Sequence, residues 1–130
     1  MMPAGPSVIE LSSVCKAFGG NVVIDRLDLT VAKGEIVALL GQTGAGKSTV
    51  LNMIMGTIPP DAGSVRVAGH DPFHDFARLR GKLAVSFQTD RLLPWRTAVE
   101  NAELGLLILG LRKAEAREIA MSWLDQLPFR

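Results

Sequence analysis

The stretch from Gly41 to Ser48 constrains this chain more than any other feature of its sequence. It reads Gly-Gln-Thr-Gly-Ala-Gly-Lys-Ser and fulfils the G-x-x-x-x-G-K-[ST] pattern of phosphate-binding loops. The nearly continuous apolar run over residues 35–40 predicts a buried strand before the loop. Apolar residues at helical spacing predict a helix over residues 49–55 after it. This order of strand, glycine-rich turn and helix predicts a loop that holds a polyphosphate.

The residue types in the loop fit that chemistry. Glycines let the backbone curl so that its N–H groups point inward, and the following helix adds the positive end of its dipole. The Lys47 ammonium is expected to reach the outer phosphates, and the Ser48 hydroxyl to complete the shell of a bound magnesium ion. A turn that merely joins a strand to a helix does not need this Lys-Ser pair. The expected phosphate contacts are Gly41, Gln42, Thr43, Gly44, Ala45, Gly46, Lys47, Ser48 and Thr49.

Composition excludes several functions. The 130 residues suit one ordinary domain, and the formal charge of +1 gives no electrostatic case for nucleic acid as a partner. A single cysteine, Cys15, excludes an internal disulfide and favours a reducing compartment, so we expect a cytoplasmic protein. Residues 1–7 lack the features of a secretory signal and are expected to form a flexible tail. The apolar stretch over residues 104–111 is too short to cross a bilayer.

Periodicity predicts an antiparallel opening. Alternating residues favour strands over residues 8–14 and 22–31, with a turn at Gly19-Gly20 between them. A third short strand is predicted over residues 64–67, and Asp71-Pro72 indicates the start of a short helix that reaches about Arg80.

A second set of elements is predicted towards the end of the chain. Residues 83–87 alternate as a strand that ends at Gln88, where a polar side chain can reach a ligand. Thr97 is expected to cap a helix over residues 98–109, which Gly110 ends. Another helix is predicted over residues 113–127, before Pro128.

Two clusters leave alternatives open. His70 and His74, with Asp71 and Asp75 beside them, suggest a metal site, but Pro72 places His70 before the helix, which favours a solvated loop. Trp95, in the apolar loop over residues 91–96, either covers the core of its own domain or anchors a partner.

Together these motifs resemble the ATP-binding cassette (ABC) ATPases, the nucleotide-binding subunits of membrane transporters, along essentially all of the chain. The Lys33–Glu35 turn and the Ser86–Gln88 segment separate it from small kinases and GTPases, which share only the loop. The resemblance implies that Phe18 stacks on adenine, although a core aromatic is an equal alternative at this position. It also implies that Gln88 touches the metal and senses a transmembrane partner. Residues 87–101 look most like importers of nitrate, sulfonates and related oxyanions.

The resemblance implies an α/β P-loop nucleotide-binding domain with an antiparallel β subdomain at its start. We expect the tail over residues 1–7, the loop core and β subdomain over 8–96, and the start of a helical subdomain over 97–130. The chain ends before the segments where the family carries its signature, its second carboxylate motif and its switch histidine, so we expect a truncated domain.

The implied function is an ATPase subunit that couples ATP, with Mg²⁺, to solute import. Its implied partners are a membrane permease, which would hold it at the inner face of the membrane, and a second nucleotide-binding subunit. The alternative is a protein that binds nucleotide without hydrolysing it, and we expect these 130 residues alone to lack hydrolysis. A P-loop kinase is a third interpretation of the motif.

Overall fold

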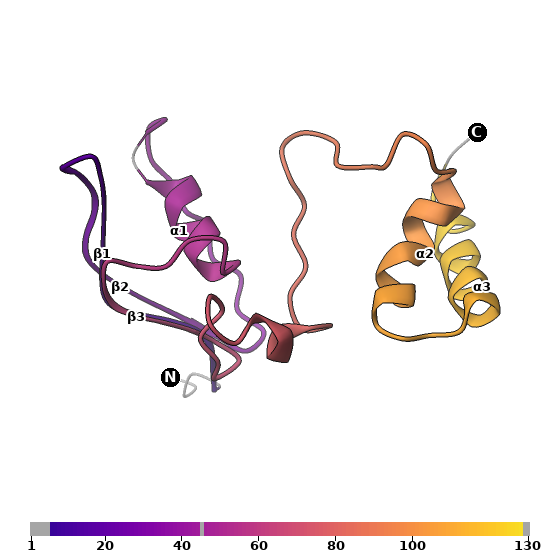
Figure 1. Cartoon of the computed structure of the whole chain (residues 1–130), viewed down its shortest axis with the longest axis horizontal. Coiled ribbons are helices and arrows are strands. Elements are labelled where there is room, and N and C mark those ends of the chain that lie inside the picture. Colours follow the sequence, from indigo (N-terminus) through magenta and orange to yellow (C-terminus); the bar gives the residue numbers. More distant parts are fainter. Residues whose placement is uncertain (1–5, 45, 129–130) are drawn as a thin grey trace. The chain divides into compact units, whose positions relative to one another are not determined.

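The computed structural model describes residues 6–44 and 46–128. The chain divides into two units, one ending at Leu83 and the other beginning at Ala84 (Figure 1). This division differs from the boundary after Arg96 that the sequence predicts, which stays a prediction. Each unit is therefore described on its own.

The first unit is built on a three-stranded antiparallel sheet. Its strands are β1 (Ser7–Phe18), β2 (Asn21–Ala32) and β3 (Ala62–Val67), in the order β2-β1-β3. The tight turn between β1 and β2 needs left-handed backbone at both Gly19 and Gly20, with φ of 55° and 80°. The predicted antiparallel opening is confirmed, and β1 already begins at Ser7, within the predicted tail.

An irregularity in the β1–β2 ladder, between Leu11 and Val14, decides which residues of β1 face the core. Leu11 and Val14 are both buried although they are three residues apart, because the register shifts between them. The shift lies at Ser13, whose φ is 48°, and its N–H donates to Asp28 Oδ1 at 2.7 Å instead of to the ladder. The bulge thus keeps the apolar side chains of β1 on one face.

Helix α1 (Lys47–Ile54) packs on that face. Its buried residues Val50, Met53 and Ile54 join the core cluster of β1, β2 and β3. The predicted helix is therefore present, but it begins at Lys47, directly after the loop. Met55 and Gly56 close it through N–H bonds to the carbonyls of Leu51 and Met53.

Residues 71–80 form less helix than predicted. Only one 3-10 turn, η1 (Phe76–Leu79), is present, and Leu79 is its buried residue. The Asp71 carboxylate accepts bonds from the N–H groups of Phe73 and His74, so the chain forms a side-chain-capped turn there instead of starting a longer helix.

The two central strands predicted over residues 35–40 and 83–87 are absent. Both runs lack regular structure, and Ile36 and Leu40 are 97% and 91% exposed. A strand exists only when its backbone pairs with a neighbouring strand. Within the described residues neither run has such a neighbour, and all of the second run except Leu83 lies in the other unit. The apolar composition of these two runs was therefore not sufficient to predict strands.

The second unit contains a helical hairpin of α2 (Ala98–Ile108) and α3 (Lys113–Leu124). Thr97 caps α2 as predicted, through a reciprocal capping box with Glu100. Gly110, with φ of 97°, follows its end. α3 stops three residues before the predicted Leu127. Among the described residues, no helix has both the length and the hydropathy of a membrane span.

Candidate functional site

The phosphate-binding pattern falls at the start of α1. Gly46 is the N-cap residue, with left-handed φ of 92°, and no described side chain caps this helix end. The first turn of α1 also contains no acidic residue. The first N–H groups of a helix have no partner within the helix, so this end can receive an anion.

Gly46 is required by its surroundings as well as by its backbone. A Cβ atom at this position would lie 2.6 Å from Cδ1 of Ile24 and 3.2 Å from the carbonyl oxygen of Val23. Val23 and Ile24 of β2 therefore pack directly against the loop at Gly46. Gly44 also has a left-handed backbone, with φ of 85°, but a Cβ there would meet open space.

Lys47 is folded against its own loop. Its Nζ donates hydrogen bonds to the carbonyl oxygens of Gly41 and Gln42, the latter at 3.0 Å. The ammonium is therefore held beside the loop at the start of α1. Ser48 is exposed and Thr49 is half-buried, one step further along the helix. Ala45 lies outside the described residues.

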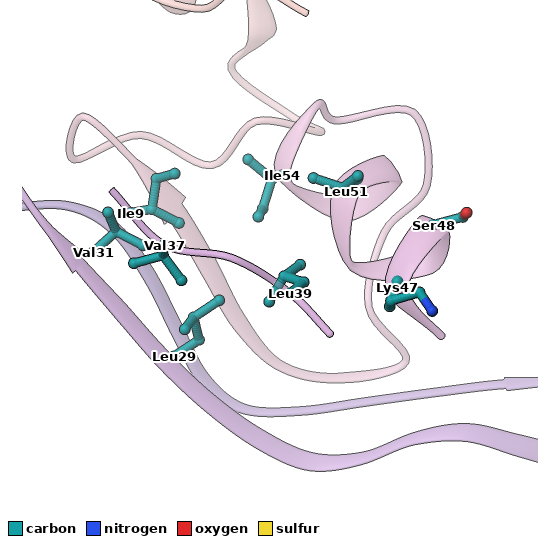
Figure 2. Close-up of a pocket in the computed structure, with 9 residues that line it drawn as sticks. All are labelled: Ile9, Leu29, Val31, Val37, Leu39, Lys47, Ser48, Leu51 and Ile54. Carbon is teal, nitrogen blue, oxygen red and sulfur yellow. The ribbon is translucent and has the colours of Figure 1, made fainter. Parts of the chain in front are cut away.

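A pocket of about 530 Å³ opens between the sheet and α1 (Figure 2). Its lining is aliphatic apart from the first two residues of α1, and consists of Ile9, Leu29, Val31, Val37, Leu39, Leu51, Ile54, Lys47 and Ser48. An apolar wall cannot compensate the charge of a polyphosphate. The lining of this pocket therefore does not suit a polyphosphate, and phosphate binding by the loop stays a prediction.

Phe18 stands at the end of β1, beside the hairpin turn. Its register partner is Asn21, and its side chain is 48% exposed, so it is not the core aromatic of the alternative interpretation. The Lys16 ammonium lies over the ring, 5.4 Å from its centroid. An exposed aromatic face is what base stacking requires, and its role stays a prediction.

Gln88 lies in the second unit and is exposed, in a segment without regular structure. Its contact with a metal stays a prediction. The nearby apolar loop keeps Leu92 and Trp95 70% and 75% exposed, which overturns the reading of Trp95 as a core residue.

Asn101 explains how that exposed loop keeps its form. Its Oδ1 accepts from the N–H of Leu93 at 2.8 Å, and its Nδ2 donates to the carbonyls of Leu93, Arg96 and Thr97. One side chain of α2 therefore ties down the loop that carries Trp95. An asparagine one turn after a capping threonine was the available signal in the sequence.

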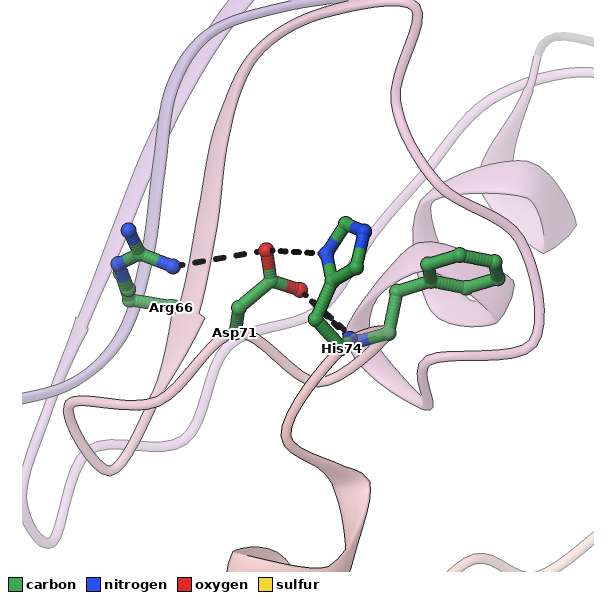
Figure 3. Close-up of polar contacts among 4 residues, drawn as sticks. Arg66, Asp71 and His74 are labelled. Atoms are coloured by element: carbon green, nitrogen blue, oxygen red, sulfur yellow. Dashed lines mark hydrogen bonds and ion pairs between the residues drawn. The ribbon is translucent and has the colours of Figure 1, made fainter.

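The histidine cluster forms a polar turn. Asp71 Oδ2 lies 3.0 Å from His74 Nδ1 and 3.6 Å from Arg66 Nη1 (Figure 3). The bond from His74, with those from the N–H groups of His74 and Phe73, lowers the pKa of Asp71. Across the described part of the chain, no three His, Cys, Asp or Glu side chains gather as metal ligands. The solvated-loop interpretation fits this geometry.

Comparison with known proteins decides the family. The family model described as ABC transporter matches residues 24–130. The chain belongs to this family. It is 35% identical over 123 residues to the taurine import ATP-binding protein TauB of Escherichia coli, covering 92% of this chain and 46% of that protein. It is 41% identical over 110 residues to the Fe(3+) ions import ATP-binding protein FbpC of Photorhabdus laumondii, covering 85% and 31%.

Solved structures agree with the fold of this ABC chain. It superposes on the dimeric ATP-binding cassette MJ0796, solved with ADP and Pi, with a TM-score of 0.75 and 28% identity. That match covers 90% of this chain and 56% of the other. An ATP-binding subunit of an ABC transporter also gives a TM-score of 0.75, at 29% identity, over 83% and 45%. The predicted fold class is confirmed, and the chain spans about half the length or less of the curated relatives named above.

Proposed function

We propose that this chain binds ATP with magnesium through residues 41–49, as the nucleotide-binding part of an importer's ATPase. The observation that carries the proposal is the position of Lys47. Its ammonium sits at the uncapped start of α1, held by two carbonyls of the glycine loop. A cation, free helix N–H groups and a hydroxyl at Ser48 together supply the donors and the metal ligand that a triphosphate needs.

The import direction and the solute rest on the relatives. Both relatives named above are import ATP-binding proteins, one for taurine and one for Fe(3+) ions. We propose a small oxyanion such as a sulfonate as the solute, because the match to the taurine protein covers more of this chain, 92% against 85%. The higher identity to the iron protein, 41% against 35%, favours an iron importer as the second candidate. Uptake assays on a strain that lacks the complete gene, with taurine and with ferric iron, separate the two.

The partners follow from the proposed role. A membrane permease would receive the exposed loop around Trp95, and a second nucleotide-binding subunit would pair with this one, as in the dimeric cassette it resembles. Gln88, four residues before Leu92, would link metal occupancy to that contact.

Isothermal titration of the 130-residue chain with MgATP tests nucleotide binding. Lys47→Ala should weaken binding by about 2–4 kcal/mol, the size of one or two charge-assisted hydrogen bonds. Lys82→Ala, which removes an exposed lysine outside the loop, is the matched control. Equal affinity in Lys47→Ala and the native chain would contradict the proposal.

Two further measurements refine it. Ser48→Ala should reduce the dependence of binding on magnesium more than the binding of metal-free ATP. Phosphate release by these 130 residues should not exceed that of Lys47→Ala, because hydrolysis also needs a group that positions water. Release clearly above that background would show that such a group is present.

A further inference from the structure

Lys16 is the residue that holds the ring of Phe18. Its Nζ lies 5.4 Å from the ring centroid, within the range of a cation–π contact. The Lys16 side chain is only 11% exposed, whereas Phe18 is 48% exposed. The cation therefore occupies a largely covered place against the ring while about half of the aromatic surface stays open.

Asp61 in turn holds Lys16. Its Oδ1 accepts from Lys16 Nζ at 3.1 Å, and its Oδ2 accepts from the N–H of Ala17 at 2.8 Å. Its own N–H donates to the carbonyl oxygen of Cys15 at 2.8 Å. The bonds from Ala17 and then Lys16 lower the pKa of Asp61, so its carboxylate stays charged to lower pH than that of an ordinary aspartate. The segment before β3 is thereby fastened to the last residues of β1.

The strand register places these groups near the phosphate-binding loop. Lys16 lies opposite Ile24 in the β1–β2 ladder, and side chains of directly opposed residues share one face of a sheet. The Ile24 side chain also lies against Gly46. The face that carries Lys16 and its ring is therefore the face that adjoins the loop.

We propose that Lys16, anchored by Asp61, is a positioning residue that holds the Phe18 ring as the wall on which the purine base of the nucleotide stacks. This inference rests on the proposed function and deepens it. With the cation against the ring and Asp61 behind the cation, the ring keeps one orientation before the ligand arrives. A ring ordered in advance loses less conformational freedom on binding, and the gain is confined to ligands that carry a base.

The test compares a ligand with a base and a ligand without one. Isothermal titration measures the affinity of the 130-residue chain for MgATP and for magnesium tripolyphosphate, which engages only the loop. Lys16→Met should lower ATP affinity by about three- to tenfold, the size of a cation–π contact, and change tripolyphosphate affinity by less than about twofold. Phe18→Leu should show the same selective loss. Lys16→Arg, which keeps a cation over the ring, should retain ATP affinity, as should the control Lys33→Met.

If Lys16→Met loses affinity equally for both ligands, or loses none, while Lys47→Ala weakens binding of both ligands, the inference is overturned and the proposed function stands. If Lys16→Met does not fold, as judged by its far-UV circular dichroism, Asp61→Asn takes its place, with the same selective loss expected and the same outcomes overturning the inference. If Lys47→Ala binds both ligands as the native chain does, the proposed function fails, and this inference fails with it.

Discussion

The side chain of Ile24 lies where a Cβ atom on Gly46 would have to go, at 2.6 Å from its Cδ1. β2 and the start of α1 are therefore in direct contact through a residue that has no side chain. Ile24 is itself buried in the core of the first unit, so it has little room to move. The position of the glycine loop is thus tied to the packing of the sheet.

The first prediction follows from this contact. Gly46→Ala should destabilise the first unit by about 2–4 kcal/mol, because left-handed backbone costs about 1–2 kcal/mol for alanine and the overpacking adds about as much again. Gly44→Ala is the matched control, since it has a similar φ but open space around its Cβ, and it should cost only the backbone share. Urea unfolding followed by circular dichroism measures both.

A companion variant isolates the contact. Ile24→Val removes Cδ1, so adding it to Gly46→Ala should recover part of the loss even though Ile24→Val alone is mildly destabilising. If Gly46→Ala and Gly44→Ala cost the same, the packing of Ile24 against the loop does not constrain it.

Local signals in the sequence were sufficient for α1, α2 and α3, but not for residues 71–80, where only one 3-10 turn forms. Thr97 and Gly110 mark the limits of α2 because a cap and a left-handed glycine act within a few residues. The glycine loop was also evident from its own eight residues. The prediction of strands over residues 35–40 and 83–87 was wrong, because strand pairing depends on partners far away in the chain. The contacts of Asp61 with Lys16 and Ala17 span more than 40 residues, so no local pattern could indicate them.

The second prediction concerns the Asp71 turn. Asp71→Asn keeps an oxygen that accepts from the N–H groups of Phe73 and His74 but loses the charge that faces His74 and Arg66. Asp71→Ala loses both. Alanine should therefore destabilise the first unit by about 1 kcal/mol more than asparagine, which is the size of one or two hydrogen bonds. Equal unfolding midpoints in urea would show that the turn does not depend on the acceptor oxygen.

The third prediction is a pH dependence in α2. The N–H of Thr97 donates to the Glu100 carboxylate at 2.8 Å, and this bond, before the others, lowers the pKa of Glu100 below its ordinary 4.5. A carboxyl group whose pKa is lower in the folded chain than in the unfolded chain stabilises the fold at pH values above its unfolded pKa. This stabilisation is lost as the pH falls through the folded pKa. In the native chain, α2 should therefore become less stable below about pH 4.5, as thermal unfolding followed by circular dichroism at 222 nm would show.

Glu100→Gln is the control for that effect. Glutamine can still accept from Thr97 but does not titrate, so the stability difference between the variant and the native chain should shrink as the pH falls from 6 to about 3. A difference that stays constant over this range would exclude Glu100 as its source.

The fourth prediction concerns the exposed loop. Trp95 is 75% exposed, and Asn101 holds the surrounding backbone with hydrogen bonds to Leu93, Arg96 and Thr97. Tryptophan is among the residue types that most often dominate the binding energy of an interface. In a complete homologous subunit, Trp95→Ala should reduce co-purification with the permease by about fivefold or more and leave ATP binding unchanged.

Trp123 provides the matched comparison for that experiment. It lies in the same unit and is also exposed, at 66%. It belongs to α3, however, and is distant in sequence from the loop that Asn101 holds. Trp123→Ala should leave co-purification intact. An equal effect of the two variants would show that general loss of apolar surface, and not the loop, weakens the complex.

The last prediction concerns Glu103, a carboxylate buried in the helical hairpin. It is 1% exposed, its Oε2 has no hydrogen-bond partner among the described residues, and its Oε1 lies 4.0 Å from Arg117 Nη1. A buried charge with a distant partner costs more in lost hydration than the attraction returns. Glu103→Met should therefore leave the hairpin as stable as before or stabilise it by up to about 2 kcal/mol.

Arg117→Ala should act in the opposite direction. It removes the cation and leaves the Glu103 carboxylate buried and unpaired, so it should destabilise α2 and α3 by roughly 1–2 kcal/mol, discounted because Arg117 is half exposed. In the double variant Glu103→Met/Arg117→Ala, the destabilisation caused by Arg117→Ala should disappear, because no buried carboxylate is left without a partner. Urea unfolding followed at 222 nm measures all three variants. If Glu103→Met is the most destabilising of them, the carboxylate stabilises the hairpin through bonds that outweigh its burial.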